Sequence, residues 1–157
     1  MALEKMQMSA PLILILNMAA TWYLVGLIWI VQVVHYPMFD RVGGNEFKRY
    51  EEDHNRLITP VVGVPMVIEL VTAIALLAFA PIGFPKWAAW TGVGLIAVIW
   101  LSTAFIQVPC HTKLLSGFQV IAHQRLVHTN WIRTACWSAR GVLLGYFLVR
   151  MFPASGP

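Results

Sequence analysis

Four long apolar stretches, separated by polar segments, dominate the pattern of the chain. They cover residues 11–36, 58–80, 87–109 and 131–152. Each is long enough to cross a bilayer as a helix, because about 20 apolar residues at about 1.5 Å per residue span the hydrocarbon. The pattern therefore predicts an all-α integral membrane protein, a four-helix bundle that forms a single transmembrane domain over residues 1–157.

The lengths of the polar segments predict how the four spans are connected. Long segments, 40–56 and 109–130, follow the first and third spans, whereas only the short turn APIGFPK separates the second from the third. This order gives two helical hairpins with both amphipathic connections on one side of the membrane and both termini on the other. A weak repeat at a spacing of 75 residues supports the division; it matches Gln32 with Gln107, Val33 with Val108, Asn55 with Asn130 and Thr59 with Thr134.

The first connection is predicted to hold a short helix that lies at the membrane surface. Gly43 and Gly44 interrupt the preceding helix, and Asn45 can cap a new one. In the second span, Pro60 and Pro65 predict a kink or an unpaired carbonyl group. The amphipathic face of the short helix repeats at helical spacing and comprises Phe47, Tyr50, His54 and Leu57.

Composition agrees with a membrane location and argues against a nucleic-acid partner. The 157 residues are 59% hydrophobic and 11% charged, whereas soluble domains carry about 25% charged residues. The net charge of +4 lies mostly in the connections, without a basic stripe interleaved with aromatic residues. The partner that composition predicts is the lipid bilayer.

Basic residues are divided unevenly between the two predicted sides. Cytoplasmic loops carry an excess of Lys and Arg. We therefore expect a bacterial inner-membrane protein with its long connections in the cytoplasm and its termini facing outward. The side with the long connections holds Arg41, Lys48, Arg49, Arg56, Lys113, Arg125 and Arg133, and the other side holds Lys5, Lys86 and Arg150.

Two ionisable side chains fall at similar depth inside the apolar spans. Glu69 is 11 residues into the second span and Arg140 is 9 residues into the fourth, counted from the same side. An unpaired charge there costs at least ~2.5–3.5 kcal/mol. The sequence therefore predicts a Glu69–Arg140 ion pair, with a protonated, hydrogen-bonded Glu69 as the alternative. Together with Arg133, near the mouth of the fourth span, these residues form the candidate catalytic set.

Amide and imidazole side chains gather nearer the long connections. Gln32 and His35 share a face of the first span, and Gln107 and His111 share a face of the third. With Asn130 at the start of the fourth span, they would line a polar cup open to one side. We expect the amides of Gln32, Gln107 and Asn130 to hold a cofactor or substrate.

Three histidines could hold a metal in this cup. His35, His54 and His111 come from both hairpins, and imidazole nitrogens bind copper, iron and zinc. The sequence has no HExxH or CxxC motif, so its spacing does not identify the metal. Non-covalent haem with His35 and His111 as axial ligands is an alternative, as are purely structural, hydrogen-bonded histidines.

Short motifs also carry a resemblance to known proteins. The chain reads QVVHYPMF, FKRYEEDH, PMVIE and NWIRTACWSAR, which together cover most of residues 29–141. This order resembles a family of uncharacterised bacterial four-span membrane proteins and is, at greater distance, similar to the anthrone-oxygenase-like membrane proteins. The resemblance implies oxygenation of an aromatic, polyketide-type substrate. The chain departs from that pattern at His111, where an asparagine is expected.

Three functions fit these observations. The first is a small membrane oxidoreductase or oxygenase that acts on a lipophilic aromatic or quinone-like substrate, with Arg133 polarising an oxygen atom and a histidine moving protons. The second is a non-catalytic accessory or assembly subunit of a larger membrane complex, or a homo-oligomer, whose polar residues join helices. The third is a proton-coupled carrier gated by the Glu69–Arg140 pair.

Overall fold

The computed structural model describes residues 2–151, with side chains from residue 10 onward. All regular elements within that range are helices, and the last residue of the predicted fourth span, 152, lies outside it. In chain order the elements are α1 (Ala2–Ile30), η1 (Val31–His35), η2 (Pro37–Arg41), α2 (Gly44–Phe79), α3 (Lys86–Ser102), η3 (Thr103–Gln107), α4 (Val108–Leu114) and α5 (Val120–Met151).

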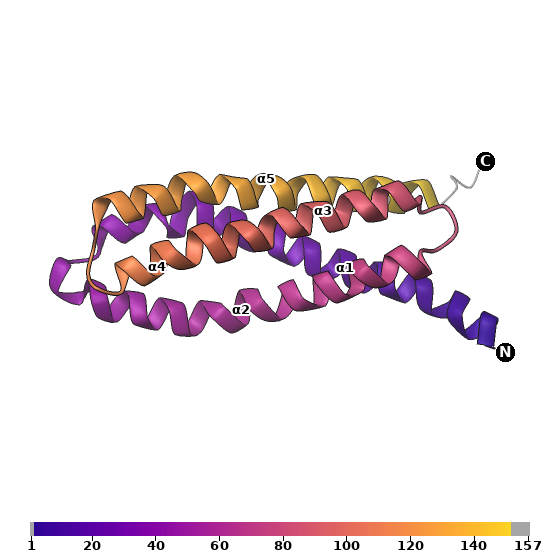
Figure 1. Cartoon of the computed structure of the whole chain (residues 1–157), viewed down its shortest axis with the longest axis horizontal. Coiled ribbons are helices and arrows are strands. Elements are labelled where there is room, and N and C mark those ends of the chain that lie inside the picture. The colour runs from indigo at the N-terminus through magenta and orange to yellow at the C-terminus, as the bar shows by residue number, and fades with distance from the viewer. Residues whose placement is uncertain (1, 152–157) are drawn as a thin grey trace, which may run out of the picture.

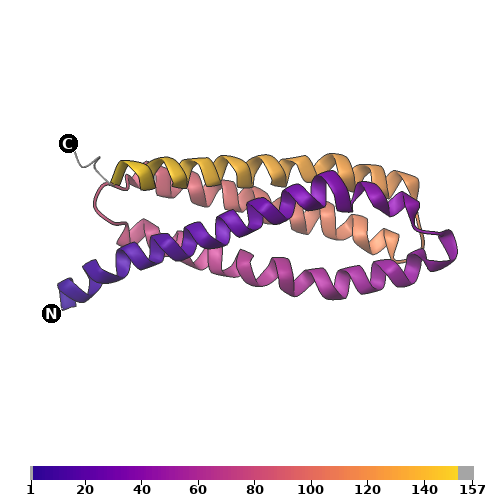
Figure 2. The ribbon, with the colours of Figure 1, turned by 180° about the vertical axis from the view of Figure 1, so that it is seen from behind.

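These elements form four long rods that lie side by side, as predicted (Figure 1). α1 with η1 is the first rod, α2 the second, α3 with η3 and α4 the third, and α5 the fourth. α1 packs against α2 and α5, and α3 packs against the same two helices. Figure 2 shows the turn between α2 and α3 at the same end as the N terminus and the end of α5, with the other two connections at the opposite end.

Three of the rods are long and apolar enough to cross a membrane. Their candidate spans are Ala10–Arg41, Gly44–Phe79 and Lys86–Leu114. α5 runs the length of the bundle beside them (Figure 1), but it is less apolar because its buried face carries polar side chains. These include Asn130, Arg133, Thr134 and Arg140.

The apolar core is divided into two clusters along the bundle. One lies toward the turn between α2 and α3 and includes Leu14, Leu76 and Leu144. The other lies toward the long connections and includes Phe39 and Leu126. Polar side chains occupy the level between the clusters, so the bundle has a polar layer inside it.

The prediction of a separate surface helix in the first connection was wrong. α2 is one continuous helix from Gly44 to Phe79, and it passes through both of its prolines. Gly43 occupies the N-cap position without a side-chain cap, so Asn45 does not cap the helix. Of the predicted amphipathic face, Phe47 and His54 are buried in the bundle, whereas Leu57 is 59% exposed. The polar connection and the second apolar span form one helix. The side of the span that packs into the bundle therefore also determines which residues of the connection are buried.

Two π-helical turns interrupt the rods at equivalent places, which the sequence did not predict. η1 is followed by Tyr36 and Pro37, and η3 by Val108 and Pro109. The Tyr36 N–H donates to the Val31 carbonyl over 2.9 Å, the spacing of a π turn. We attribute each turn to the proline that follows, which lacks an N–H and crowds the carbonyl four residues earlier. Such turns often mark functional sites.

Candidate functional site

The predicted ion pair between Glu69 and Arg140 is present in the polar layer. Arg140 Nε donates to Glu69 Oε1 over 2.8 Å, and both side chains are buried. Thr21 Oγ1 donates to the same carboxylate oxygen over 2.6 Å, and Trp137 Nε1 donates to the other over 3.0 Å. Arg140 Nη2 donates to Asn17 Oδ1 over 2.6 Å. The network joins α1, α2 and α5, and a catalytic role for Glu69 or Arg140 stays a prediction.

A glycine on α3 completes the surroundings of this pair. A Cβ atom added to Gly92 would collide with Arg140 Nη1. The space left by the missing side chain is therefore filled by the guanidinium group. Through this contact the buried pair constrains how closely α3 approaches α5.

The three histidines predicted to bind a metal do come together at the end with the long connections. His35 Nε2 lies 2.9 Å from His54 Nδ1. The His54 and His111 rings are stacked, with their centroids 5.2 Å apart. η1, α2 and α4 thus each contribute one imidazole to a single cluster.

Hydrogen bonds already occupy both ring nitrogens of His111. Its Nδ1 lies 2.6 Å from Glu51 Oε1, and its Nε2 lies 3.0 Å from the Tyr36 hydroxyl. Within residues 2–151, no group of three or more His, Cys, Asp or Glu side chains is arranged to hold a metal ion. A metal bound by all three histidines does not fit this arrangement, because His111 would have to give up one of its partners. The metal and haem hypotheses stay predictions.

Glu51 and Tyr36 are members of the cluster that sequence reasoning missed. Glu51 is fully buried, and its Oε1 also accepts a hydrogen bond from Asn55 Nδ2 over 3.1 Å. The seven-residue spacing from Phe47 to His54 could have indicated Glu51, because a helical face between them passes through residue 50 or residue 51. The pairing of Glu51 with a histidine in the other hairpin leaves no signal in the sequence.

The amides predicted to hold a cofactor connect α5 to its neighbours, and their role in cofactor binding stays a prediction. Asn130 Nδ2 donates to Gln32 Oε1 over 2.9 Å, and Gln32 Nε2 donates to the Val127 carbonyl over 3.1 Å. Gln107 Nε2 donates to Thr129 Oγ1 over 3.2 Å. Gln107 also lines a cavity, so a ligand contact at this residue stays a prediction.

Arg133 is the buried cation without a carboxylate partner. It is 5% exposed, and none of the ion pairs among the described residues includes it. Its Nη1 donates to Asn130 Oδ1 over 3.2 Å, and its Nε has no hydrogen-bond partner. The guanidinium carbon lies 5.1 Å from the centroid of the Trp137 ring. Burying a cation with so few acceptors is costly, which makes this side chain the strongest indication of a binding site.

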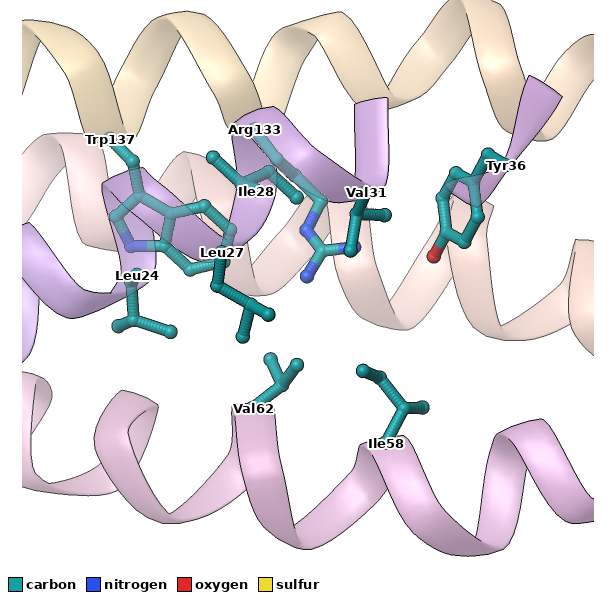
Figure 3. A pocket seen from close by; sticks show the side chains of 9 residues that line it. All are labelled: Leu24, Leu27, Ile28, Val31, Tyr36, Ile58, Val62, Arg133 and Trp137. Carbon is teal, nitrogen blue, oxygen red and sulfur yellow. The ribbon is translucent and has the colours of Figure 1, made fainter. Parts of the chain in front are cut away.

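A cavity of about 250 Å³ lies beside Arg133, between α2 and the third rod. Tyr36 and His111 also line it, whereas Val62 and Met66 belong to its apolar wall. Figure 3 shows a smaller adjoining space, in which the guanidinium of Arg133 and the hydroxyl of Tyr36 both point toward α2. A cavity with a mostly apolar surface and a few polar groups in its wall is typical of sites for small lipophilic molecules.

Comparison with protein-family models, with curated proteins and with solved structures finds no match for this chain. The resemblance to anthrone-oxygenase-like proteins therefore stays a prediction. What the described residues show is a small helical bundle with candidate membrane spans and a buried network of His, Glu and Arg side chains. Its function has to be argued from the cavity and the groups that line it.

Proposed function

We propose that this chain is a small membrane oxidoreductase or oxygenase that binds a lipophilic aromatic or quinone-like substrate in the cavity between α2 and the third rod. The observation that carries the proposal is Arg133, a buried guanidinium that lines the cavity and has no carboxylate partner among the described residues. The distant resemblance to anthrone-oxygenase-like proteins points to the same substrate class.

In this proposal, Arg133 recognises an oxygen atom of the substrate. A guanidinium presents five N–H donors in a planar fork and remains charged in proteins. The Nε of Arg133 is enclosed by protein, whereas Nη2 is not enclosed and has no protein acceptor among the described residues, so a phenolate, enolate or carbonyl oxygen in the cavity would accept from Nη2. Hydrogen bonds to charged groups contribute about 1.5–3 kcal/mol each, which lowers the pKa of a bound phenol or enol by about one to two units.

The proton is handled by Tyr36, His111 and Glu51. With the Glu51 carboxylate accepting from Nδ1 of His111, Nε2 is left as an acceptor for the Tyr36 hydroxyl. The Tyr36 oxygen can then take a proton from a substrate hydroxyl as it releases its own proton to His111. This arrangement performs general-base catalysis without exposing the carboxylate to the substrate.

The alternative of a proton-coupled carrier places function at Glu69 and Arg140, which would have to separate during transport. Hydrogen bonds from α1 and α5 hold the Glu69 carboxylate of α2, and each of its two oxygens accepts at least one of them. The arrangement favours an inter-helix junction over a gate. We therefore place the chemistry at Arg133.

The proposal is tested with 4-nitrophenol, whose phenolate absorbs visible light, added to the protein in lipid nanodiscs. We expect the wild type to raise the bound phenolate fraction at fixed pH above that in empty nanodiscs. Arg133→Gln should lose this gain and bind the phenolate about tenfold more weakly. Arg125→Gln, which changes an exposed arginine of the same helix, is the matched control. A phenolate fraction that does not depend on Arg133 would contradict the proposal.

A further inference from the structure

We infer that the ligand reaches the cavity sideways from the bilayer, through an opening between α2 and the third rod, and that Gly63 sets how large a ring the cavity accepts. The inference rests on the proposed function, because it concerns the route and the size of the same ligand. It adds a lipid-facing opening and a specificity-determining residue to the site at Arg133.

The residues that line the cavity run from the outer surface of the bundle to its interior. Val108 is 53% exposed, and Thr59 and Trp100 are also exposed. At the inner end, Met66 and Arg133 are buried. The cavity therefore connects the buried guanidinium with the surface between two neighbouring rods.

Exposed apolar side chains of the third rod lie at this opening. Trp100 and Val108 line the cavity and are exposed, and Leu101 and Phe105 on the same rod are exposed as well, with Phe105 71% exposed. α2 and the third rod are also among the helices that are long and apolar enough to cross a membrane. An opening framed by such side chains faces hydrocarbon, where a lipophilic phenol or quinone concentrates.

Gly63 leaves bare helix backbone in the wall of the cavity. It lies within α2, where glycine is less favourable than alanine by about 0.8–1.0 kcal/mol. A Cβ atom added there would meet nothing within 4 Å, and Gly63 is not among the residues with positive φ. Neither packing against a neighbour nor backbone conformation requires this glycine. Its consequence is free space, against which a flat ring can lie.

The opposite wall is formed around the π turn η3. Thr103 and Gln107 belong to that turn, and Val108 follows it directly. A π turn is a local departure from the regular α-helix, so the third rod is irregular where it borders the cavity. The two walls together describe a slot with Arg133 at its inner end.

Ring size is tested by comparing the binding of 2-naphthol with that of 4-nitrophenol in nanodiscs. Gly63→Leu should weaken naphthol binding by at least about tenfold and nitrophenol binding less, because a side chain fills the slot. Gly63→Ala should also weaken naphthol binding more than nitrophenol binding, but by a smaller factor. Because alanine is well tolerated in a helix, this variant keeps the test valid if Gly63→Leu does not fold. Gly94→Leu is the matched control, since Gly94 lies in a helix, has open space around it and does not line the cavity. Unchanged naphthol affinity in both Gly63 variants would overturn the role of Gly63.

The route is tested by the rate of naphthol binding in stopped-flow fluorescence. Val108→Trp should slow binding several-fold, because Val108 lies at the exposed end of the cavity and a larger side chain there narrows the opening. Val149→Trp, at an exposed position far along α5, should leave the rate unchanged. A wild-type rate in Val108→Trp would overturn the lateral route. If ligand binding depends on Arg133 but not on Gly63 or Val108, the lateral route and the role of Gly63 are wrong while the proposed function stands. If ligand binding does not depend on Arg133, the proposed function is wrong.

Discussion

Arg140 and Glu69 meet side chain to side chain, Nε to Oε1 over 2.8 Å, in a polar layer enclosed between two apolar clusters. Asn17 and Thr21 add hydrogen bonds from α1, and Gly92 gives the guanidinium room on α3. A buried ion pair is weak support for stability, because removing both charges from water offsets much of their attraction. Its clearer consequence is that it fixes the positions of the four rods relative to one another along the bundle axis.

Breaking this pair should cost far more than removing it. Glu69→Leu leaves Arg140 buried without its carboxylate, and we expect a loss of about 3–5 kcal/mol in the free energy of unfolding. The double variant Glu69→Leu/Arg140→Leu should recover most of that loss. Denaturant unfolding in detergent measures both. Arg150→Gln, at the exposed end of α5, is the control, and equal stability of the single and double variants would show that the pair is not coupled.

Two glycines on α3 should respond in opposite directions to the same substitution. Gly92→Ala places a methyl group against the Arg140 guanidinium and should destabilise the protein by about 1–3 kcal/mol. Gly94→Ala meets open space and should stabilise it by up to about 1 kcal/mol through helix propensity. Thermal unfolding of the two variants in one detergent makes the comparison. Similar shifts for both would mean that Arg140 does not pack as described.

The histidine cluster gives a prediction about metal content. Because His111 is bonded through both ring nitrogens, we expect the purified protein to hold well under one metal per chain and His111→Ala to leave that content unchanged. Elemental analysis and a visible spectrum for haem provide the measurement, with exposed His128→Ala as the control. A full equivalent of metal, lost in each of the His35, His54 and His111 variants, would instead support the metal site predicted from sequence.

The excess of Lys and Arg predicts that the long connections face the cytoplasm. Cysteines introduced at two exposed positions test this orientation: Ile82, in the turn between α2 and α3, and Ser116, after α4. A membrane-impermeant maleimide should label Ile82→Cys in intact spheroplasts and Ser116→Cys only in inverted vesicles. The unsubstituted chain, with Cys110 buried and Cys136 half-buried, is the control. The reverse labelling pattern would show that the arginine count reflects the site rather than topology.

The four rods and the Glu69–Arg140 pair could be predicted because each depends on position along a helix. Apolar length determines which segments can cross a bilayer, and residue count multiplied by rise places two charges at one depth. The surface helix failed for a related reason. The predicted interruption at Gly43 and Gly44 is present, but nothing in the local pattern shows that α2 continues unbroken from Gly44 into the second span and through its prolines.

By itself, the sequence determined an all-helical bundle with apolar outer faces and a buried charge pair, because burial pattern and depth are one-dimensional properties of a helix. Only the tertiary structure decided which side chains meet across helices. His111 lies within hydrogen-bonding distance of Glu51 and Tyr36, and Arg133 lines a cavity and does not contact a carboxylate of the described residues. These contacts depend on the rotation of each helix about its axis and on how the rods pack together. Neither can be predicted from the spacing of residues within one segment of the chain.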